Sequence, residues 1–180
     1  LWNQPESIVT PRGHMLLLAE IAGEKPIAHV GFGGLTLTAS LQLKPDVEQK
    51  TPHEYFRLKV LNSDYVLEAK VQGIWKRIYS FGLHENFLPD YEVTSWYLSN
   101  YPTSHFVTGL IAAVPFENGR HTLRNIDFAT HYLDGSHDRK RFEDVGHLRD
   151  VLENTFQITL PDLPTIDESF AALIQKSMKK

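Results

Sequence analysis

The chain has 180 residues, of which 42% are hydrophobic and 22% are charged, and it carries a formal net charge of −4 at pH 7. These values are typical of a folded globular protein and exclude a disordered chain, and the length is enough for one domain or two small ones. Lysine and arginine are scattered rather than gathered into a basic stripe, and no apolar run approaches the roughly 20 residues of a membrane helix, so we expect neither a nucleic-acid nor a membrane partner.

Cysteine use and targeting signals set two further limits. The sequence contains no cysteine, which excludes disulfides, thiolate metal sites and a cysteine nucleophile among these residues. It also shows no secretory signal, from which we expect a soluble protein in the cytoplasm.

The first hundred residues predict an antiparallel sheet. Residues 14–22 (HMLLLAEIA) and 25–30 (KPIAHV) are expected to form a hairpin across the Gly-Glu-Lys turn at 23–25. Residues 35–43 alternate apolar and polar side chains, as a half-buried strand does, and a loop with two prolines follows at 44–54. A meander then continues the sheet through strands at 55–61, 65–71 and 74–81. Six short strands with tight turns favour a small barrel or a sandwich.

The pattern changes near residue 83, where the second half begins. Residues 90–100 (DYEVTSWYLSN) have apolar side chains at near-helical spacing, and Pro102 stops that pattern. Two strands are expected at 110–116 and 121–133, joined by a turn at 117–120. The second half therefore begins as a new sheet.

Two helices are predicted to close the chain. Residues 145–156 form an amphipathic helix with Asp144 as its N-cap. Its shared apolar face consists of Val145, Leu148, Val151, Leu152 and Phe156. Residues 165–180 carry acidic side chains in the first turn and lysines in the last turn, as the helix dipole prefers. Together with the two strands, these helices predict a small α/β unit.

Two histidines at the first hairpin are the strongest candidates for a functional site. His14 begins the first predicted strand, and His29 ends the second, just before Gly31, Phe32 and Gly33. In an antiparallel hairpin the start of one strand lies beside the end of the other, so the two histidines are expected to lie together. Glycines beside them let a backbone approach a ligand closely. A single strand histidine is more often structural, but the pair beside a glycine bend suits a site.

The remaining polar and aromatic clusters have plainer explanations. The other histidines show no metal-ligand spacing, so no metal site is expected; they are His53, His84, His105, His121, His131, His137 and His147. The aromatic residues of 95–102, with Phe106, are expected to pack in a core, with a pocket wall as the minority interpretation. Residues 138–144 (DRKRFED) are expected to form a solvated loop, although three cations there could attract a phosphate.

The sequence resembles the arylamine N-acetyltransferases along nearly its whole length. Residues 11–34 (PRGHMLLLAEIAGEKPIAHVGFGG) resemble the family pattern Pro-Arg-Thr-His, an apolar run, and Val-Asp-Val-Gly-Phe-Gly-Gly. The likeness continues in the same order through LTLTASLQL, TPHEYFRL, YSFGL, SWYLSNYPTSHF and TLRNIDF. So many collinear matches argue strongly against chance.

The resemblance implies a fold and a division of the chain. The family has a helical bundle with the catalytic cysteine, a β-barrel with the histidine and aspartate, and an α/β lid. The expectation here is an α+β, mostly β fold: an antiparallel β-barrel and a small α/β lid of the cysteine-proteinase-like acetyltransferase fold, without its helical bundle. The implied boundaries are a barrel domain at 1–99, a connection at 100–115 and a lid at 116–180.

The resemblance also implies a chemistry and a set of site residues. In the family a cysteine thiolate, paired with histidine and oriented by aspartate, takes an acetyl group from acetyl-CoA as co-substrate and passes it to an arylamine or hydrazine. His14 matches the catalytic histidine and His29 the position of the aspartate. The matching coenzyme-binding positions are Gly13, Gly31, Phe32, Gly33 and Phe106. No metal is implied.

Three departures from the family pattern change the expectation. The cysteine-bearing segment, Arg-Gly-Gly-Tyr-Cys-Phe-Glu in the family, has no counterpart in these 180 residues. Gly13 replaces threonine, and His29 replaces the triad aspartate. A unit charge about 4 Å away is worth roughly 4 kcal/mol at an effective dielectric near 20, and a neutral imidazole does not supply it. Weakened or altered catalysis is therefore expected even with a cysteine present.

Two functions follow from this sequence. We favour an acetyl-CoA-dependent arylamine N-acetyltransferase of xenobiotic metabolism, seen as a truncated chain that is inactive alone. The alternative is a non-catalytic, degenerate relative that binds a ligand or a partner. Self-association is also possible, through the apolar face that the missing helical bundle would otherwise cover.

Overall fold

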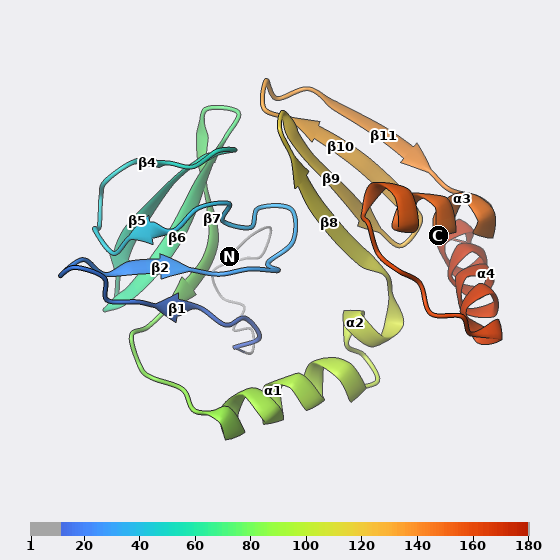
Figure 1. Cartoon of the computed structure of the whole chain (residues 1–180), viewed down its shortest axis with the longest axis horizontal. Helices are drawn as coiled ribbons and strands as arrows, with labels where there is room; N and C mark the ends of the chain where they lie inside the picture. Colours follow the sequence, from blue (N-terminus) through green and yellow to red (C-terminus); the bar gives the residue numbers. More distant parts are fainter. Residues whose placement is uncertain (1–11, 180) are drawn as a thin grey trace. The chain divides into compact units, whose positions relative to one another are not determined.

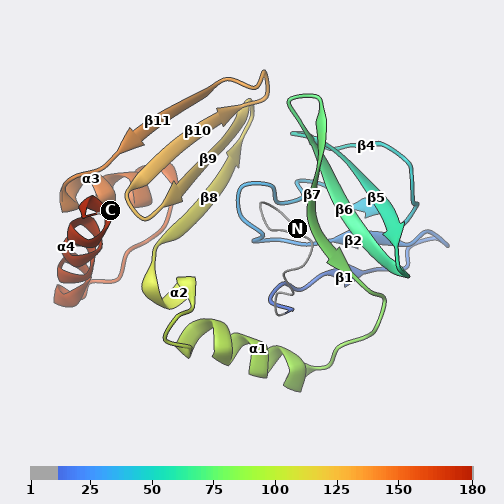
Figure 2. The same ribbon diagram turned by 180° about the vertical axis from the view of Figure 1, so that it is seen from behind.

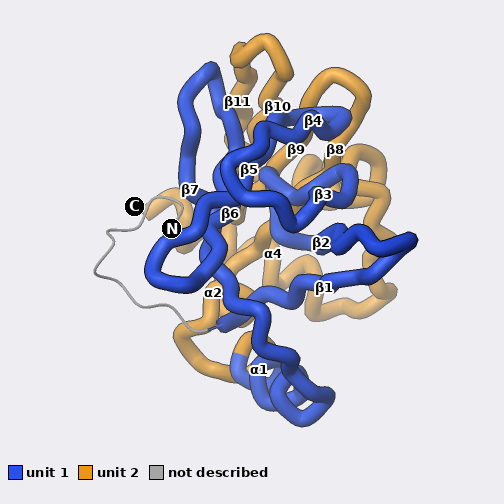
Figure 3. The backbone as a smooth tube through the Cα atoms, turned by 90° about the vertical axis from the view of Figure 1, so that its left-hand side faces the viewer, with its two compact units in different colours: residues 1–97 blue, residues 98–180 orange. Residues whose placement is uncertain are grey.

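Figure 1 shows the computed structural model of the chain, which describes residues 12–179. The chain divides into two compact units, residues 1–97 and residues 98–180, which Figure 3 draws in different colours. Helix α1 (Leu88–Asn100) crosses from the first unit into the second. The division into 1–99, 100–115 and 116–180 stays a prediction.

The first unit consists of two open antiparallel sheets (Figure 1). One has the order β1-β2-β3 and contains Leu17–Leu18 (β1), Pro26–Ala28 (β2) and Leu41–Gln42 (β3). The other has the order β4-β5-β6-β7 and contains Gln49–Lys50 (β4), Tyr55–Leu61 (β5), Asp64–Val71 (β6) and Ile74–Phe81 (β7). The predicted meander over 55–81 is confirmed. The expected closed barrel is not, because the strands described here pair in two separate sheets.

Three predicted strands of the first unit are shorter than expected. The first hairpin turns at Ala22 and Gly23 rather than at the predicted 23–25, and their positive φ values of 52° and 80° are those of a tight hairpin turn. Its regular ladder is limited to β1 and β2, with one isolated bridge between Ile21 and Glu24. Within the predicted strand 35–43, only Leu41 and Gln42 pair. The alternation there marks burial of Leu37 and Leu41 in the core rather than a continuous ladder.

A hydrophobic core lies inside the first unit. It takes side chains from both sheets, and its fully buried members include Ile27, Leu41, Phe56, Leu58 and Leu67. Burial of each such side chain contributes about 1.5–3 kcal/mol to stability. This core supports the short hairpin β1–β2 from which the site is built.

The second unit is a four-stranded antiparallel sheet with helices on one face, as Figures 1 and 2 both show. Its sheet order is β11-β10-β9-β8, and its strands are Ile111–Phe116 (β8), Gly119–Arg124 (β9), Asp127–Tyr132 (β10) and His137–Arg141 (β11). Its helices are His105–Thr108 (α2), Val145–Asp150 (α3), the π-helical turn Val151–Thr155 (η1) and Pro164–Met178 (α4). Leu123 of the sheet packs with Leu148, Leu152 and Phe170 of the helices in a second core.

The second unit corrects three sequence expectations. The predicted strand 121–133 is two strands, β9 and β10, because the chain turns at Asn125, which has a φ of 57°. The predicted loop 138–144 contains the edge strand β11, whose side chains are all exposed and therefore gave no apolar alternation. The predicted helix 145–156 is regular only to Asp150 and continues as a π-helical turn.

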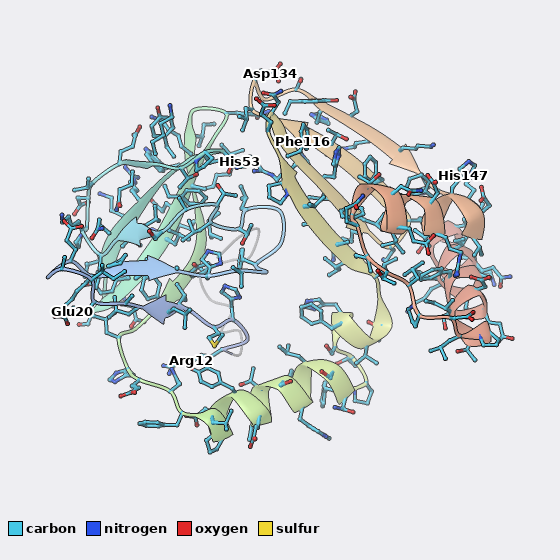
Figure 4. The ribbon with its side chains drawn as sticks, viewed as in Figure 1. Arg12, Glu20, His53, Phe116, Asp134 and His147 are labelled. Carbon is cyan, nitrogen blue, oxygen red and sulfur yellow. The ribbon has the colours of Figure 1, made fainter. Side chains whose placement is uncertain are left out.

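Side-chain positions at the ends of this unit can be followed in Figure 4. Phe116 lies at the end of β8, and Asp134 lies in the turn between β10 and β11. The cap of α3 is as predicted: the carboxylate of Asp144 accepts a 2.8 Å hydrogen bond from the backbone N–H of His147. Among residues 12–179, no helix combines the length and apolarity needed to cross a membrane.

Candidate active site

The two candidate histidines lie side by side. The β1–β2 ladder pairs Leu17 with Ala28, so the chain before β1 runs beside the chain after β2. The ring centroids of His14 and His29 are 4.8 Å apart, with an angle of 88° between the ring planes. The hairpin argument from the sequence therefore predicted the proximity of His14 and His29 correctly.

Two aromatic side chains complete a cluster with this pair. Phe32, from the glycine bend, lies 5.0 Å from His14 and 5.8 Å from His29, measured between ring centroids. Tyr79, from β7, lies 5.7 Å and 5.6 Å from the same two rings and 4.8 Å from Phe32. We call these four residues the His14–His29 cluster. It joins the first hairpin and its glycine bend to β7, which lies much later in the sequence.

The polar atoms of the cluster are buried without hydrogen-bond partners. His29 is only 4% exposed, and Tyr79 is 8% exposed. Within the part of the chain that the structure describes, His14 Nε2, both ring nitrogens of His29 and the Tyr79 hydroxyl have no hydrogen-bond partner. Most buried polar groups in proteins are paired, so this concentration of unpaired atoms makes the cluster the candidate site of the first unit.

Burial keeps both imidazoles neutral. Burial, and to a smaller extent the neighbouring charge of protonated His14, together lower the pKa of His29 to about 4. Burial also lowers the pKa of His14. For Tyr79, burial raises the pKa of the phenol, so the hydroxyl stays protonated. At neutral pH the cluster therefore offers nitrogen lone pairs and N–H groups but no net charge.

The glycine bend next to the cluster depends on backbone conformation. Gly31 has a φ of 75° and Gly33 a φ of 103°, values that residues with a Cβ rarely adopt. A Cβ built at either position meets no described atom within 4 Å. Glycine is therefore required here by the dihedral angles and leaves open space beside the backbone. Gly13, just before His14, is exposed.

Phe106 belongs to the second unit. It lies on the short helix α2, its side chain is 58% exposed, and its ring centroid is 4.4 Å from that of His105. This exposure contradicts the expectation that Phe106 packs in a core, and its contact with the coenzyme stays a prediction.

Sequence reasoning did not single out Tyr79. It was part of the similar segment YSFGL, but a tyrosine in a strand has no spacing that marks it as a site residue. Its place in the cluster follows from the β6–β7 ladder, where Leu67 pairs with Tyr79 and the register shifts between Leu67 and Glu68. For a metal, residues 12–179 contain no group of three or more histidine or acidic side chains that could hold an ion.

Comparison with known proteins places these features in one family. The family model described as N-acetyltransferase matches residues 1–164. The chain is 36% identical over 166 residues to an arylamine N-acetyltransferase of Mycolicibacterium smegmatis, covering 91% of this chain and 60% of the relative. It is 38% identical over 164 residues to the Escherichia coli K12 arylamine N-acetyltransferase, covering 88% of this chain and 58% of the relative.

Solved structures agree with the sequence matches. The fold is similar to that of the M. smegmatis arylamine N-acetyltransferase, with a TM-score of 0.90 and 34% identity over 97% of this chain and 65% of that one. It is similarly close to a Mycobacterium marinum arylamine N-acetyltransferase in complex with CoA, with a TM-score of 0.88, 34% identity and the same coverage. The chain spans about 60% of the length of the curated relatives named above. On this sequence match and this shared fold, the chain belongs to the arylamine N-acetyltransferase family.

Proposed function

We propose that this chain supplies the histidine pair and the coenzyme-contacting residues of an acetyl-CoA-dependent N-acetyltransferase that acetylates arylamines or hydrazines. The observation that carries the proposal is the pairing of His14 with His29 in one buried cluster. The family relationship and the CoA complex of the M. marinum relative support it.

In this mechanism His14 is the base that activates a thiol. The thiolate attacks the acetyl carbonyl of acetyl-CoA, the CoA thiolate leaves and takes up a proton, and an acetyl-cysteine remains. The amine then attacks that thioester, the carbon–sulfur bond breaks to give the acetylated amine, and the proton lost by the amine passes to the released thiolate. The 180 residues contain no cysteine, so the thiol is not among them, and this chain alone should not turn over.

His29 takes the place at which the family has an aspartate. A neutral imidazole can accept the N–H of His14 through its lone pair, which orients the His14 ring. It supplies no negative charge to stabilise a protonated His14, and burial disfavours its own protonation. The pair therefore orients His14 but gives less support to a thiolate–imidazolium pair than a carboxylate would.

Coenzyme contacts are assigned to the glycine bend and, from the sequence resemblance alone, to Gly13 and Phe106. Gly31 and Gly33 leave open space beside the backbone, and Phe32 contributes an aromatic wall. Gly13 and the exposed ring of Phe106 complete the proposed coenzyme contacts. All of them offer backbone or aromatic surface rather than charge.

Coenzyme binding can be tested on the chain as it is. We expect CoA to bind weakly in isothermal calorimetry and Gly33→Val to abolish the signal. Gly73→Val is a matched control, because Gly73 also has a positive φ of 77° and open space around it but lies in the β6–β7 turn. Equal loss in both variants would reflect general strain, and unchanged affinity in Gly33→Val would place the site elsewhere.

Acetyl transfer needs a protein that also contains a cysteine. Joining this chain to the part of the M. smegmatis relative that it does not cover would supply one. We expect single-turnover acetylation in that fusion and its loss in His14→Gln. His53→Gln, a histidine bonded to Thr38 outside the cluster, should leave the rate unchanged.

A second candidate is a non-catalytic relative that binds a ligand or partner. The observation that favours it is the neutral His29 at the carboxylate position. Retained CoA binding together with no acetylation in the fusion would support this second function over the first.

A further inference from the structure

A histidine in place of an aspartate raises a question of hydrogen-bond direction. A carboxylate only accepts hydrogen bonds, whereas a neutral imidazole carries one N–H and one lone pair. To accept the N–H of His14, His29 must present its lone pair toward that ring. Its own N–H then needs an acceptor elsewhere in a buried environment.

The cluster contains one further group that can accept. Phe32 has no polar atom, while Tyr79 has a buried hydroxyl without a hydrogen-bond partner among the described residues. The Tyr79 ring lies 5.6 Å from the His29 ring, and both ring nitrogens of His29 are also buried and unpartnered there, so the structure itself forms no hydrogen bond between the two side chains. Because an unpaired buried polar group is costly, two such neighbours are expected to reorient and pair. We propose that Tyr79 is a positioning residue, whose hydroxyl oxygen accepts the N–H of His29 and so fixes the His29 tautomer that presents its lone pair to His14.

The direction of this chain of bonds decides what His14 can do, and here the inference rests on the proposed function. If His29 donates its N–H to His14, the facing nitrogen of His14 accepts and its proton sits on the far nitrogen. His14 then has no lone pair left for a thiol proton. With the Tyr79 oxygen as acceptor, the bonds run from His14 to His29 to Tyr79, and the far nitrogen of His14 stays free as a base.

The site suits this role for Tyr79 in two ways. Burial favours the neutral phenol over the phenolate, so the hydroxyl keeps its proton and uses an oxygen lone pair to accept. The residue is also held by the core, because it pairs with Leu67 in the β6–β7 ladder and packs on Phe32. Because its position is fixed, the Tyr79 oxygen can select one of the two tautomers of His29.

Imidazole ¹⁵N NMR on the whole 180-residue chain, near pH 8, tests the proposal. The shifts report which ring nitrogen carries the proton, whether or not the protein turns over. We expect a single His29 tautomer in the unaltered chain and a mixture in Tyr79→Phe. Tyr65→Phe is the matched control, since Tyr65 stacks on Phe81 in the same sheet but lies outside the cluster. Backbone amide spectra would verify that both variants keep the fold.

The same substitution of Tyr79 in the His29→Asp protein distinguishes a hydrogen-bonding role of Tyr79 from a packing role. In His29→Asp the carboxylate has no N–H to place, so His14 should keep one tautomer with either tyrosine or phenylalanine at position 79. The proposal is overturned if Tyr79→Phe leaves the His29 tautomer unchanged, or if it disturbs His14 equally in the His29→Asp background. If the NMR results are as expected but the unaltered fusion shows no acetylation, the proposed function fails while the role of Tyr79 stands.

Discussion

Two histidines of this chain, one in each unit, show what a carboxylate neighbour does. His147, on the helical side of the second unit, is exposed, and its side chain and backbone N–H both bond to Asp144. His29, in the first unit, is buried among His14, Phe32 and Tyr79, and neither of its ring nitrogens has a partner among the described residues.

The comparison of the two histidines shows how a neighbouring carboxylate changes the environment of an imidazole. At Asp144 the hydrogen bonds from the backbone and side chain of His147 lower the pKa of the carboxyl group, so that group stays ionised at neutral pH. At His29 no carboxylate offsets the cost of burial, and the pKa of the imidazole falls to about 4. The same residue type therefore contacts an exposed carboxylate in one unit and belongs to a neutral buried cluster in the other.

The largest expected effect on the acetylation rate comes from replacing His29 with an aspartate. In the fusion that supplies a cysteine, His29→Asp should raise single-turnover acetylation about tenfold to a thousandfold, since a few kcal/mol of electrostatic support is restored at roughly tenfold per 1.4 kcal/mol. The rate should also persist to lower pH, because aspartate stays ionised where histidine titrates.

His29→Asn is the matched control for that experiment. It offers a hydrogen-bond acceptor of similar size without charge, and it should recover little of the gain. If the His29 protein already matches His29→Asp between about pH 5 and 9, the range in which histidine titrates, position 29 does not support His14. The non-catalytic function would then gain ground.

Acid stability gives the next largest effect. The folded chain holds His29 with a depressed pKa, so the unfolded chain binds more protons as the pH falls below about 6.5. Stability should be full above that pH and should drop as the pH falls toward 4, by on the order of 3 kcal/mol, because one pKa unit corresponds to about 1.4 kcal/mol. Urea unfolding at several pH values would measure this loss.

A variant without the buried imidazole sharpens the result. His29→Gln should flatten the loss between pH 6.5 and 4, leaving the smaller contribution of His14. His84→Gln, at an exposed position in the same unit, should retain the full pH slope. Equal slopes in all three proteins would show that the cluster is solvated in solution.

The sequence predicted the fold best where pattern and pairing coincide. The strands at 55–61 and 74–81 are found with the expected bounds, because tight turns and alternation fix a local meander. The segment 35–43 was overpredicted, since alternation reports which side chains are buried and not whether a neighbouring strand pairs. Strand β11 was missed because an exposed edge strand of charged residues has no apolar period to detect.

The part of the candidate site that lies on the first hairpin could be predicted from the sequence. His14 and His29 belong to one local hairpin, so their spacing was enough to bring them together. Tyr79 comes from a strand much later along the chain, and its approach depends on how the two sheets share a core. That information lies in tertiary packing rather than in any short motif.

The smallest expected effect concerns the pair that does have its carboxylate. Asp144→Ala removes the acceptor for the backbone N–H of His147 and should lower the melting temperature of the second unit by a few degrees, since the first turn of α3 loses its cap. Asp144→Asn keeps an acceptor oxygen without the charge, and it should recover most of this loss if the cap rather than the ion pair is what stabilises α3. Thermal unfolding of both variants by circular dichroism measures the difference. If Asp144→Asn proves as unstable as Asp144→Ala, the stabilisation belongs instead to the charged bond with the His147 ring. In that case the Asp144–His147 pair would show directly how a carboxylate stabilises a neighbouring histidine, an interaction that His14 and His29 do not have among the described residues.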